Sequence, residues 1–483
     1  MLEHTYDIIV VGGGLAGLYA SKKLIKEGHS VLVLEARDRV GGRTLTEKHG
    51  DHYWDLGGQW VGGTHYLLQD LVKELGLEMF DQYEEGDHIL DVNGKQIKYA
   101  GNISNLNDKY SLDGVFEAIQ KLDTMAFSLP SVSDPLSGKP NIDEKQYGNP
   151  KTWDSQTIAE WTSKNVKGDD GRAIINWFAR VCLGQEPLEM SLLYFLVFLK
   201  AGEGYSRLAD IKGGAQEKRI VNGSQQVSTR LKELLEKNKN FDIKLNSTVH
   251  RIEQHPTAGV SVTVWNDDLG VKDQRVYKAK YCIVAVPPTI SRKIDFYPLV
   301  SGARDELTQR MPMGCIIKVI VVYKNRFWRE KGFSAEVISD TGPIFICYDD
   351  SAPDGTSAIV GFIGAQAARE WATRTEAERQ SAICKQYARY WGEEALHPIK
   401  YLEKDWRTER HSGGCYVGLL GPGAITACHK GLREPCGRIH WAGTETASKW
   451  IAYMEGALES GERVAKEVSE RVYSSNDQLK SKL

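Results

Sequence analysis

Short apolar runs and one amphipathic stretch alternate at the start of the chain. Residues 6–11 (YDIIVV) form an apolar run, which predicts a buried strand. A glycine-rich turn and a helix ending near Lys26 follow, and residues 30–35 (SVLVLE) form a second apolar run. Strand, glycine loop, helix and strand in this order predict the first unit of a parallel sheet. Residues 65–75 carry leucine and valine at helical spacing and predict another helix.

The pattern then changes several times, which indicates two interleaved domains. Residues 89–212 contain aromatic-rich helical stretches, and the apolar runs at 280–286 and 315–323 predict buried strands. The chain should finish in a helix with apolar residues along one face. We assign residues 1–88, 213–297 and 400–470 to one domain, 89–212 and 298–399 to a second, and 471–483 to a flexible tail.

Composition narrows the class of protein without deciding it. The chain has 483 residues, too many for one simple core, with 41% hydrophobic and 26% charged residues. Its net charge of −3, without long runs of either sign, argues against nucleic acid or an anionic membrane surface as a partner. The eight cysteines have no CxxC spacing, so we expect no zinc site and reduced, intracellular thiols. The longest apolar run, 192–199, is too short to cross a bilayer.

The last three residues, Ser481-Lys482-Leu483, match a peroxisomal targeting tripeptide. A receptor binds this signal, so the preceding tail should be flexible, and its polar composition after Ser469 suits that. The alternative interpretation is a chance ending. We therefore predict a peroxisomal protein that an import receptor recognises.

The turn after the first strand carries a dinucleotide fingerprint. Gly12 permits a tight turn, Gly14 lets the backbone approach a pyrophosphate, and Gly17 lets helix and strand pack closely. The N-terminus of the helix offers unpaired N–H groups to phosphates. Glu35, at the end of the second strand, can accept hydrogen bonds from a ribose diol. These features predict a dinucleotide-binding domain with a Rossmann-like α/β fold.

The segment after the second strand distinguishes between dinucleotides. Arg37 and Arg43 flank the pair Gly41-Gly42, and an arginine can neutralise a pyrophosphate with two parallel hydrogen bonds. This extension resembles FAD-binding oxidoreductases more than NAD dehydrogenases, because a surface run of charge would not explain the two glycines. The further turn Gly57-Gly58-Gln59 is expected to approach the flavin ring.

Four segments together resemble one family of flavoenzymes. They are residues 34–44 (LEARDRVGGRT), 310–318 (RMPMGCIIK), 412–416 (SGGCY) and 442–456 (AGTETASKWIAYMEG). Over nearly its full length the chain resembles the flavin-dependent monoamine oxidases, and SGGCY is the most specific string because many noncovalent relatives lack its cysteine. The resemblance implies the flavin amine oxidase fold, in which an FAD-binding domain interleaves with a mixed α+β substrate domain. It also implies oxidation of an amine to an imine, with O2 reduced to hydrogen peroxide.

The resemblance further implies roles for individual residues. Cys415 matches the cysteine that forms a thioether to the 8α-methyl of FAD, although a small buried thiol is the plainer alternative. Tyr416 and Tyr453 match an aromatic pair in front of the flavin. Lys318 matches a lysine that binds a water near flavin N5, and its alternative is an outward-facing strand position. The remaining matches are Val249, Trp406, Gly443, Thr444 and Met454 on the cofactor side and Gln216 in the substrate cavity.

The chain departs from the family at the cavity entrance. Ala209 stands where the mammalian enzymes carry a bulky phenylalanine or isoleucine, and Ile346 is small enough to leave another gating position open. We therefore predict a longer or wider pocket. Asp210 could meet a distant polar group of a long substrate, but a solvated loop residue is the plainer interpretation. The C-terminal membrane helix of the mammalian enzymes is absent, so we expect a soluble protein.

Other functions remain open. The small side chain of Ala209 is compatible with a peroxisomal polyamine oxidase of the same fold, although the cysteine motif argues against that function. An L-amino-acid oxidase would need an arginine for the substrate carboxylate, and the sequence places none in the cavity. A chromatin amine oxidase would bring added domains, and a non-catalytic flavoprotein would not keep every matched reactive position. The natural amine stays open within a default range of aliphatic and aromatic primary amines, and a homodimer is one option because relatives are often dimers.

Overall fold

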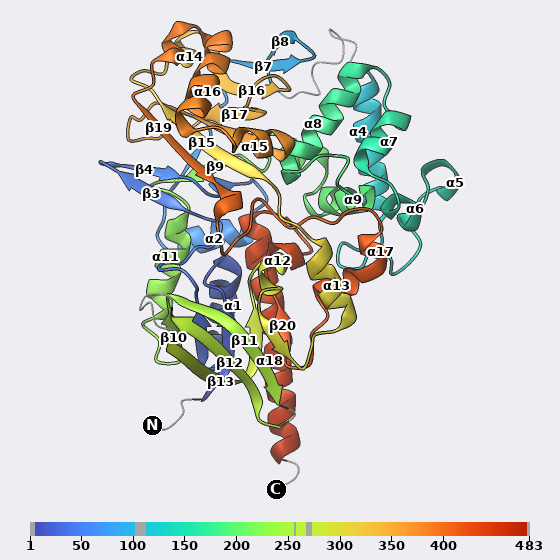
Figure 1. Cartoon of the computed structure of the whole chain (residues 1–483), viewed down its shortest axis with the longest axis vertical. Helices are drawn as coiled ribbons and strands as arrows, with labels where there is room; N and C mark the ends of the chain where they lie inside the picture. Colours follow the sequence, from blue (N-terminus) through green and yellow to red (C-terminus); the bar gives the residue numbers. More distant parts are fainter. Residues whose placement is uncertain (1–4, 102–112, 256, 267–272, 481–483) are drawn as a thin grey trace.

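A computed structural model of the chain describes residues 5–101, 113–255, 257–266 and 273–480. Two large sheets lie at opposite ends of the molecule, and segments from the beginning and the end of the chain occur at both ends (Figure 1). The Ser481-Lys482-Leu483 ending lies outside the described residues. In the part that the structure describes, no helix combines the length and the apolar character needed to cross a membrane.

The eight-stranded sheet, at the lower end in Figure 1, contains the predicted nucleotide unit. Its order is β10-β2-β1-β13-β12-β11-β14, with β20 beside β13, and the row from β10 to β13 is parallel. Ile8, Ile9 and Val10 are fully buried, as expected for a parallel strand covered on both faces. The strands are β1 (Thr5–Val11), β2 (Val31–Leu34), β10 (Phe241–Lys244), β11 (Ser247–His255), β12 (Gly259–Asn266), β13 (Asp273–Val284), β14 (Asp295–Tyr297) and β20 (Ile439–Trp441).

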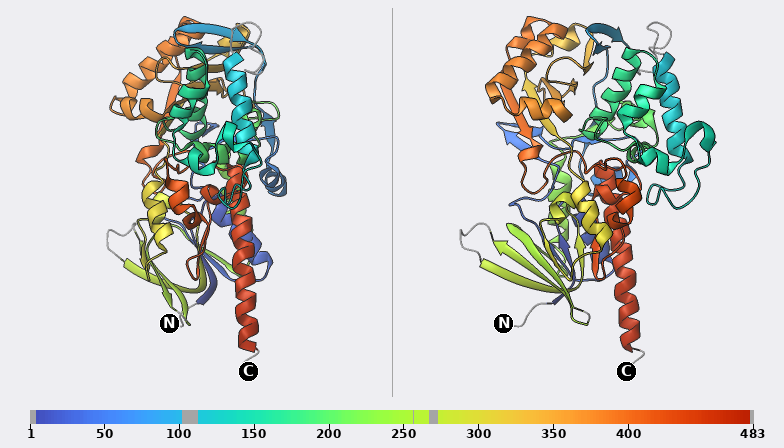
Figure 2. Two further views of the ribbon diagram at one scale, coloured as in Figure 1. Left: turned by 90° about the vertical axis from the view of Figure 1, so that its right-hand side faces the viewer. Right: turned by 45° about the vertical axis from the view of Figure 1, so that its right-hand side comes forward.

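Two helices from opposite ends of the chain pack together beside this sheet. α1 (Leu15–Lys26) directly follows the glycine turn, and α18 (Met454–Lys480) is the long C-terminal helix that runs down to the C-terminus in Figure 2. A Cβ at Gly461 would lie 2.5 Å from the carbonyl oxygen of Ala16, so glycine allows this close approach. The predicted strand, helix, strand unit and C-terminal helix are confirmed.

The seven-stranded sheet at the other end has the order β19-β15-β18-β17-β16-β7-β8. Lys318 on β15 is paired with Phe362 on β18, Phe362 with Ile346 on β17, and Ile346 with Ile338 on β16. Because directly paired residues point to the same face, these four side chains form one row across the sheet. The strands are β7 (Asp87–Val92), β8 (Lys95–Tyr99), β15 (Ile316–Val322), β16 (Phe333–Ser339), β17 (Ile346–Asp349), β18 (Ala358–Gly364) and β19 (Lys400–Asp405).

Helices flank the second sheet in two groups, α14 to α16 on one side and α4, α7, α8 and α9 on the other (Figures 1 and 2). The longest apolar run forms α9 (Leu192–Ala201), whose residues are buried except Lys200, so this helix belongs to the core. The remaining helices are α2 (Tyr66–Glu74), α4 (Asp113–Ser128), α5 (Glu144–Tyr147), α6 (Pro150–Asp154), α7 (Ile158–Asn165), α8 (Asp169–Leu183), α10 (Tyr205–Ala209), α11 (Gln225–Leu235), α12 (Pro288–Ser291), α13 (Gly302–Arg310), α14 (Phe327–Glu330), α15 (Ala365–Trp371), α16 (Glu376–Trp391) and α17 (Ala424–Cys428). Small two- and three-stranded sheets contain β3 (Thr46–His49), β4 (His52–Asp55), β5 (Trp60–Val61), β6 (Met79–Asp81) and β9 (Lys218–Ile220).

The predicted domain boundaries stay a prediction, but two segments differ from the local pattern expected there. Residues 87–99 overlap the start of the stretch 89–212, in which the sequence predicted helices. They form the hairpin β7–β8 of the second sheet. β19 begins at Lys400, where the chain was expected to return to the first domain, and pairs with β15 in the second sheet. Both segments belong to the second sheet because they pair with strands that are distant in sequence. The local hydrophobic pattern does not predict such pairing.

Candidate active site

Backbone contacts that exclude side chains shape the turn between β1 and α1. Gly12 has φ +106°, and a Cβ at Gly17 would lie 2.1 Å from the carbonyl oxygen of Gly12. The Gly41 amide donates to the carbonyl of Gly13 at 3.0 Å, which holds the second glycine pair against the first turn. Gly14 and Gly42 therefore offer bare backbone on one side of a cavity, beside the N-terminus of α1. This geometry suits the close approach of a pyrophosphate.

Glu35 and Arg37 line the cavity together with Gly14 and Gly42. The amides of Gly13 and Arg37 donate to the two carboxylate oxygens of Glu35 at 2.6 and 2.9 Å, and these oxygens retain further lone pairs for a diol. Arg37 donates to the hydroxyl of Ser412 at 2.9 Å, while its buried Nε has no partner among the described residues. An anionic ligand in the cavity would satisfy such an orphaned donor.

A buried ion pair joins the glycine turns to the SGGCY segment. The guanidinium of Arg43 meets the carboxylate of Glu445 with two hydrogen bonds, at 2.7 and 3.1 Å, and also donates to the carbonyl of Tyr416 at 2.8 Å. Burial disfavours both charges, but their attraction and hydrogen bonds outweigh it, so the pKa of Arg43 is raised and that of Glu445 is lowered. Both groups are therefore charged and mutually fixed.

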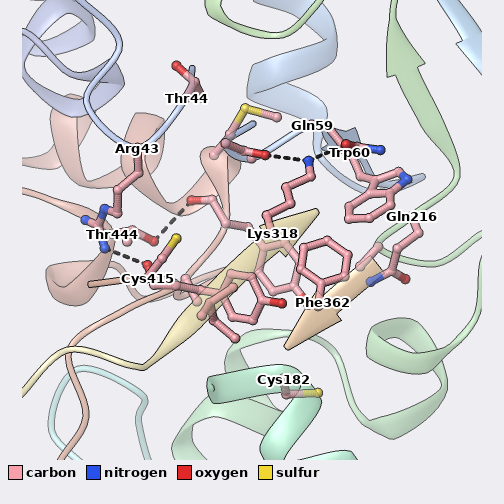
Figure 3. A pocket seen from close by; sticks show the side chains of 18 of the residues that line it. Arg43, Thr44, Gln59, Trp60, Cys182, Gln216, Lys318, Phe362, Cys415 and Thr444 are labelled. Carbon is pink, nitrogen blue, oxygen red and sulfur yellow. Dashed lines mark hydrogen bonds between the residues drawn. The ribbon is translucent and has the colours of Figure 1, made fainter. Parts of the chain in front are cut away.

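Lys318 extends from β15 into the cavity, with its ammonium beside the neighbouring rings of Trp60 and Phe362 (Figure 3). It is only 2% exposed, so it does not face solvent. Its ammonium donates to the carbonyl of Gly57 at 2.8 Å and to the side-chain oxygen of Gln59. Burial lowers the pKa of Lys318 to about 8, so both protonation states are accessible near neutral pH.

Gln59 links this lysine to a second buried ion pair. Its amide nitrogen donates to Asp350 at 3.0 Å, and Asp350 lies 2.7 Å from the guanidinium of Arg219. Asp350 is 1% exposed and Arg219 is 7% exposed. A chain of polar contacts therefore runs from Lys318 to Arg219 with little access to water, where such contacts are strong.

Tyr416 and Tyr453 both line the cavity, and other rings hold each of them. The ring centroid of Tyr416 is 6.2 Å from that of Phe362. The ring of Tyr453 lies 5.1 Å from Trp450 and 5.5 Å from His65, edge to face in both cases. Edge-to-face packing of this kind restricts the position of a ring. Two tyrosines from segments 37 residues apart are thereby fixed at one site.

Cys415 is a buried cysteine in the wall of the same cavity. Its amide donates to the carbonyl of Gly314 at 3.0 Å, and the peptide bond that joins it to Tyr416 is cis. Burial raises the pKa of its thiol to about 12, against the attraction of Arg43 and Lys318. The sulfur is therefore protonated at neutral pH. In Figure 3, Cys415 lies on the same side of Lys318 as Arg43 and Thr444, opposite Trp60 and Gln216.

One cavity of about 570 Å³ joins all of these groups. Every predicted site residue lines it except Gly17, which packs behind the first turn, and Val249, which lies in the buried core of the first sheet on β11. The sequence did not indicate several other groups, although Glu445 belongs to a segment that carried the resemblance. Those residues are Tyr205, Glu336, Tyr348 and Phe362, which line the cavity, and Arg219, Asp350 and Glu445, which form the two buried ion pairs.

A glycine-lined dinucleotide cradle beside a buried aromatic chamber defines an oxidoreductase. The family model of flavin containing amine oxidoreductases matches residues 15–469, and the chain belongs to this family. A probable flavin-containing monoamine oxidase A of Dictyostelium discoideum is 49% identical over 474 residues, 97% of this chain and 99% of that protein. A flavin-containing amine oxidase of Oncorhynchus mykiss is 39% identical over 472 residues, 96% of this chain and 86% of that protein.

Solved structures agree with the fold. Cyclohexylamine oxidase from Brevibacterium oxydans IH-35A has a TM-score of 0.88 and 30% identity, covering 97% of this chain and all (100%) of that chain. Wild-type putrescine oxidase bound to putrescine has a TM-score of 0.86 and 27% identity, covering 97% and 100%. The predicted flavin amine oxidase fold is confirmed, and the protein is an FAD-dependent oxidoreductase that acts on amines. The bare backbone at Gly14 and Gly42 and the orphaned donor of Arg37 fit that cofactor.

Proposed function

We propose that this protein oxidises primary amines in a cavity whose flavin is bonded to Cys415. A primary amine, O2 and water would give an aldehyde, ammonia and hydrogen peroxide. The observation that supports this most is the convergence of Cys415, Tyr416, Tyr453 and Lys318 on the cavity that the glycine turns line. Bound there, FAD supplies the acceptor for a hydride equivalent from the carbon next to nitrogen and passes two electrons to O2.

The glycine turns and Arg37 would bind the pyrophosphate, and Glu35 the ribose. Tyr416 and Tyr453 would orient the amine, because electron-rich ring faces attract the partly positive hydrogens of its N–H and C–H bonds and restrict its position. Aromatic side chains line the wall near these tyrosines, and the neighbouring carboxylate of Glu445 is paired with Arg43. Desolvation in such a chamber favours the neutral amine, which is the reactive form.

Lys318 would act on the oxygen half of the reaction. Below a pH of about 8 it carries a positive charge, held by Gly57 and Gln59. A fixed cation stabilises the negative charge that O2 acquires during reduction. Its ammonium also has a third hydrogen, which can bind a water molecule in the cavity.

The covalent bond would join Cys415 to the 8α-methyl group of FAD. Replacing an S–H and a C–H bond with one C–S bond releases two electrons and two protons, which O2 accepts as hydrogen peroxide. The buried position of Cys415 in the cavity wall supports this assignment. The plainer alternative, a structural buried thiol, predicts a flavin that dissociates on denaturation.

We place the protein in peroxisomes, where its Ser481-Lys482-Leu483 ending would bind the import receptor. Production of hydrogen peroxide suits a compartment that contains catalase. Deleting Leu483 from a fluorescent fusion should move the signal from peroxisomes to the cytosol, and an unchanged distribution would contradict the address. A homodimer also stays a prediction, which light scattering of the purified protein would test.

A panel of amines with a peroxide-coupled assay tests the activity. We expect turnover of aliphatic and aromatic primary amines and loss of most turnover in the Lys318→Met variant. Oxidation of L-amino acids alone would overturn the proposal in favour of an amino-acid oxidase. Oxidation of internal amines of spermine, without primary monoamines, would favour a polyamine oxidase.

A further inference from the structure

Acidic side chains gather in one part of the cavity, where Glu336 and Glu84 both act electrostatically on Asp210. Four carboxylates line this acidic end: Glu84, Glu85, Asp210 and Glu336. The basic side chains that line it with them are Lys212 and His88. Glu84 and Glu85 also line a groove on the surface, so the acidic end lies toward the outside. Within the cavity, an amine at this end would meet more carboxylates than basic side chains.

The second sheet connects the acidic end to Lys318. The row of paired residues from Lys318 through Phe362 and Ile346 ends at Ile338, and all four line the cavity. Glu336 is two residues from Ile338 on β16 and lines the same cavity. Three strand spacings separate β15 from β16, which corresponds to about 14 Å. An extended molecule lying on this face can thus reach from Lys318 to Glu336.

The carboxylates are held in place. Nδ1 of His88 lies 3.2 Å from Glu336, and the Tyr99 hydroxyl lies 3.4 Å from the other oxygen of the same carboxylate. Asp210 follows directly after α10 and is partly buried. Burial first, and then repulsion by Glu336 and Glu84, raise the pKa of Asp210 to about 6, although Arg207 opposes this. A second positive charge at this point would relieve the repulsion.

Two hydroxyl groups at the same end indicate a ligand independently of the charges. Tyr205 and Tyr348 are 4% and 6% exposed, and both line the cavity. No hydrogen bond of either hydroxyl occurs among the described residues, although the tyrosine side chains are nearly buried. Glu336 acts electrostatically on Tyr348, and Asp210 on Tyr205, so the tyrosines lie near the carboxylates. The hydroxyls are therefore available to accept hydrogen bonds from a cationic group.

We infer that the acidic end binds a second ammonium group of the substrate, so that the enzyme prefers diamines over monoamines of equal length. The inference rests on the proposed function, because it needs one amino group to react beside Tyr416 and Tyr453. A metal ion is a poorer occupant, since no group of three His, Cys, Asp or Glu residues in the described ranges can hold one. An ammonium at the end of a flexible chain suits carboxylates spread along a wall.

Matched pairs of substrates test this inference. Hexylamine, octylamine and decylamine are each compared with the α,ω-diamine of the same chain, and kcat/KM is measured for both. The diamine should be preferred, most strongly for the longer chains. Asp210→Asn and Glu336→Gln should each lower the ratio of diamine to monoamine kcat/KM about tenfold, through a higher KM for the diamine with kcat retained.

Glu233→Gln is the matched control, because it removes the same charge from the exposed surface of α11 and should leave the ratio unchanged. Should the Glu336→Gln protein not fold, Asp210→Asn alone decides. Equal kcat/KM for monoamine and diamine, or a ratio that neither variant lowers, would overturn the inference while leaving the proposed function intact. No turnover of any amine would contradict the proposed function itself.

Discussion

The two ends of the cavity differ in how their charged side chains are paired. At the flavin end, Arg43 is paired with Glu445, and Lys318 has two oxygen acceptors. At the acidic end, like charges stand side by side, and the hydroxyls of Tyr205 and Tyr348 have no partner among the described residues. The charged groups of the flavin end are therefore paired with opposite charges or acceptors, whereas carboxylates outnumber basic groups at the acidic end, where Glu336 contacts His88 and Tyr99.

The largest effect is expected from breaking the flavin end. Arg43→Ala leaves the carboxylate of Glu445 buried without its partner, which should lower the free energy of unfolding by about 3–5 kcal/mol. Urea unfolding of the purified variant measures this change. Lys232→Ala is the control, because its ion pair with Glu236 is exposed and should contribute about 1 kcal/mol or less. Equal decreases in the free energy of unfolding of the two variants would show that the buried ion pair contributes no more to stability than the exposed one.

A second variant separates the two ends by filling the space between them. Ala209→Phe should raise KM for decylamine relative to propylamine about ten- to a hundredfold, because a bulky ring blocks the path of a long chain. Steady-state kinetics with both amines gives the ratio. Ala209→Ser adds a single oxygen and should leave the ratio within about twofold. An unchanged ratio in Ala209→Phe would mean that long amines do not pass this residue.

The smallest effect concerns the proton on Lys318. In Gln59→Leu the ammonium loses an acceptor that favours its charged form, so the pKa of Lys318 should fall further, by about one unit from about 8. The pH midpoint of flavin reoxidation by O2, followed by stopped flow, should move to lower pH. Gln59→Glu places a carboxylate there and should move it to higher pH. Shifts of the same sign in both variants would exclude this role for Gln59.

The same contrast explains what could be predicted from the sequence. The nucleotide unit lies in a short contiguous segment whose spacing determines its geometry, so local pattern was sufficient there, whereas the roles of Cys415 and Tyr416 came from the family resemblance. Glu336 comes to line the cavity through the pairing of β16 with β17, and Asp350 is connected to it only through its contact with Gln59. Single acidic residues within apolar strands give no motif. Val249 was predicted to contact the adenine half of the cofactor through its backbone; its side chain lies in the core, and the backbone contact stays a prediction.

Acid precipitation of the purified protein tests the central claim, that Cys415 bonds the flavin, most directly. We expect the yellow chromophore in the pellet of the wild-type protein and in the supernatant of Cys415→Ala. Cys182→Ala is the matched control, because this thiol also lines the cavity and its removal should leave the colour in the pellet. A wild-type flavin that moves to the supernatant, or a Cys415→Ala pellet that stays yellow, would contradict the account.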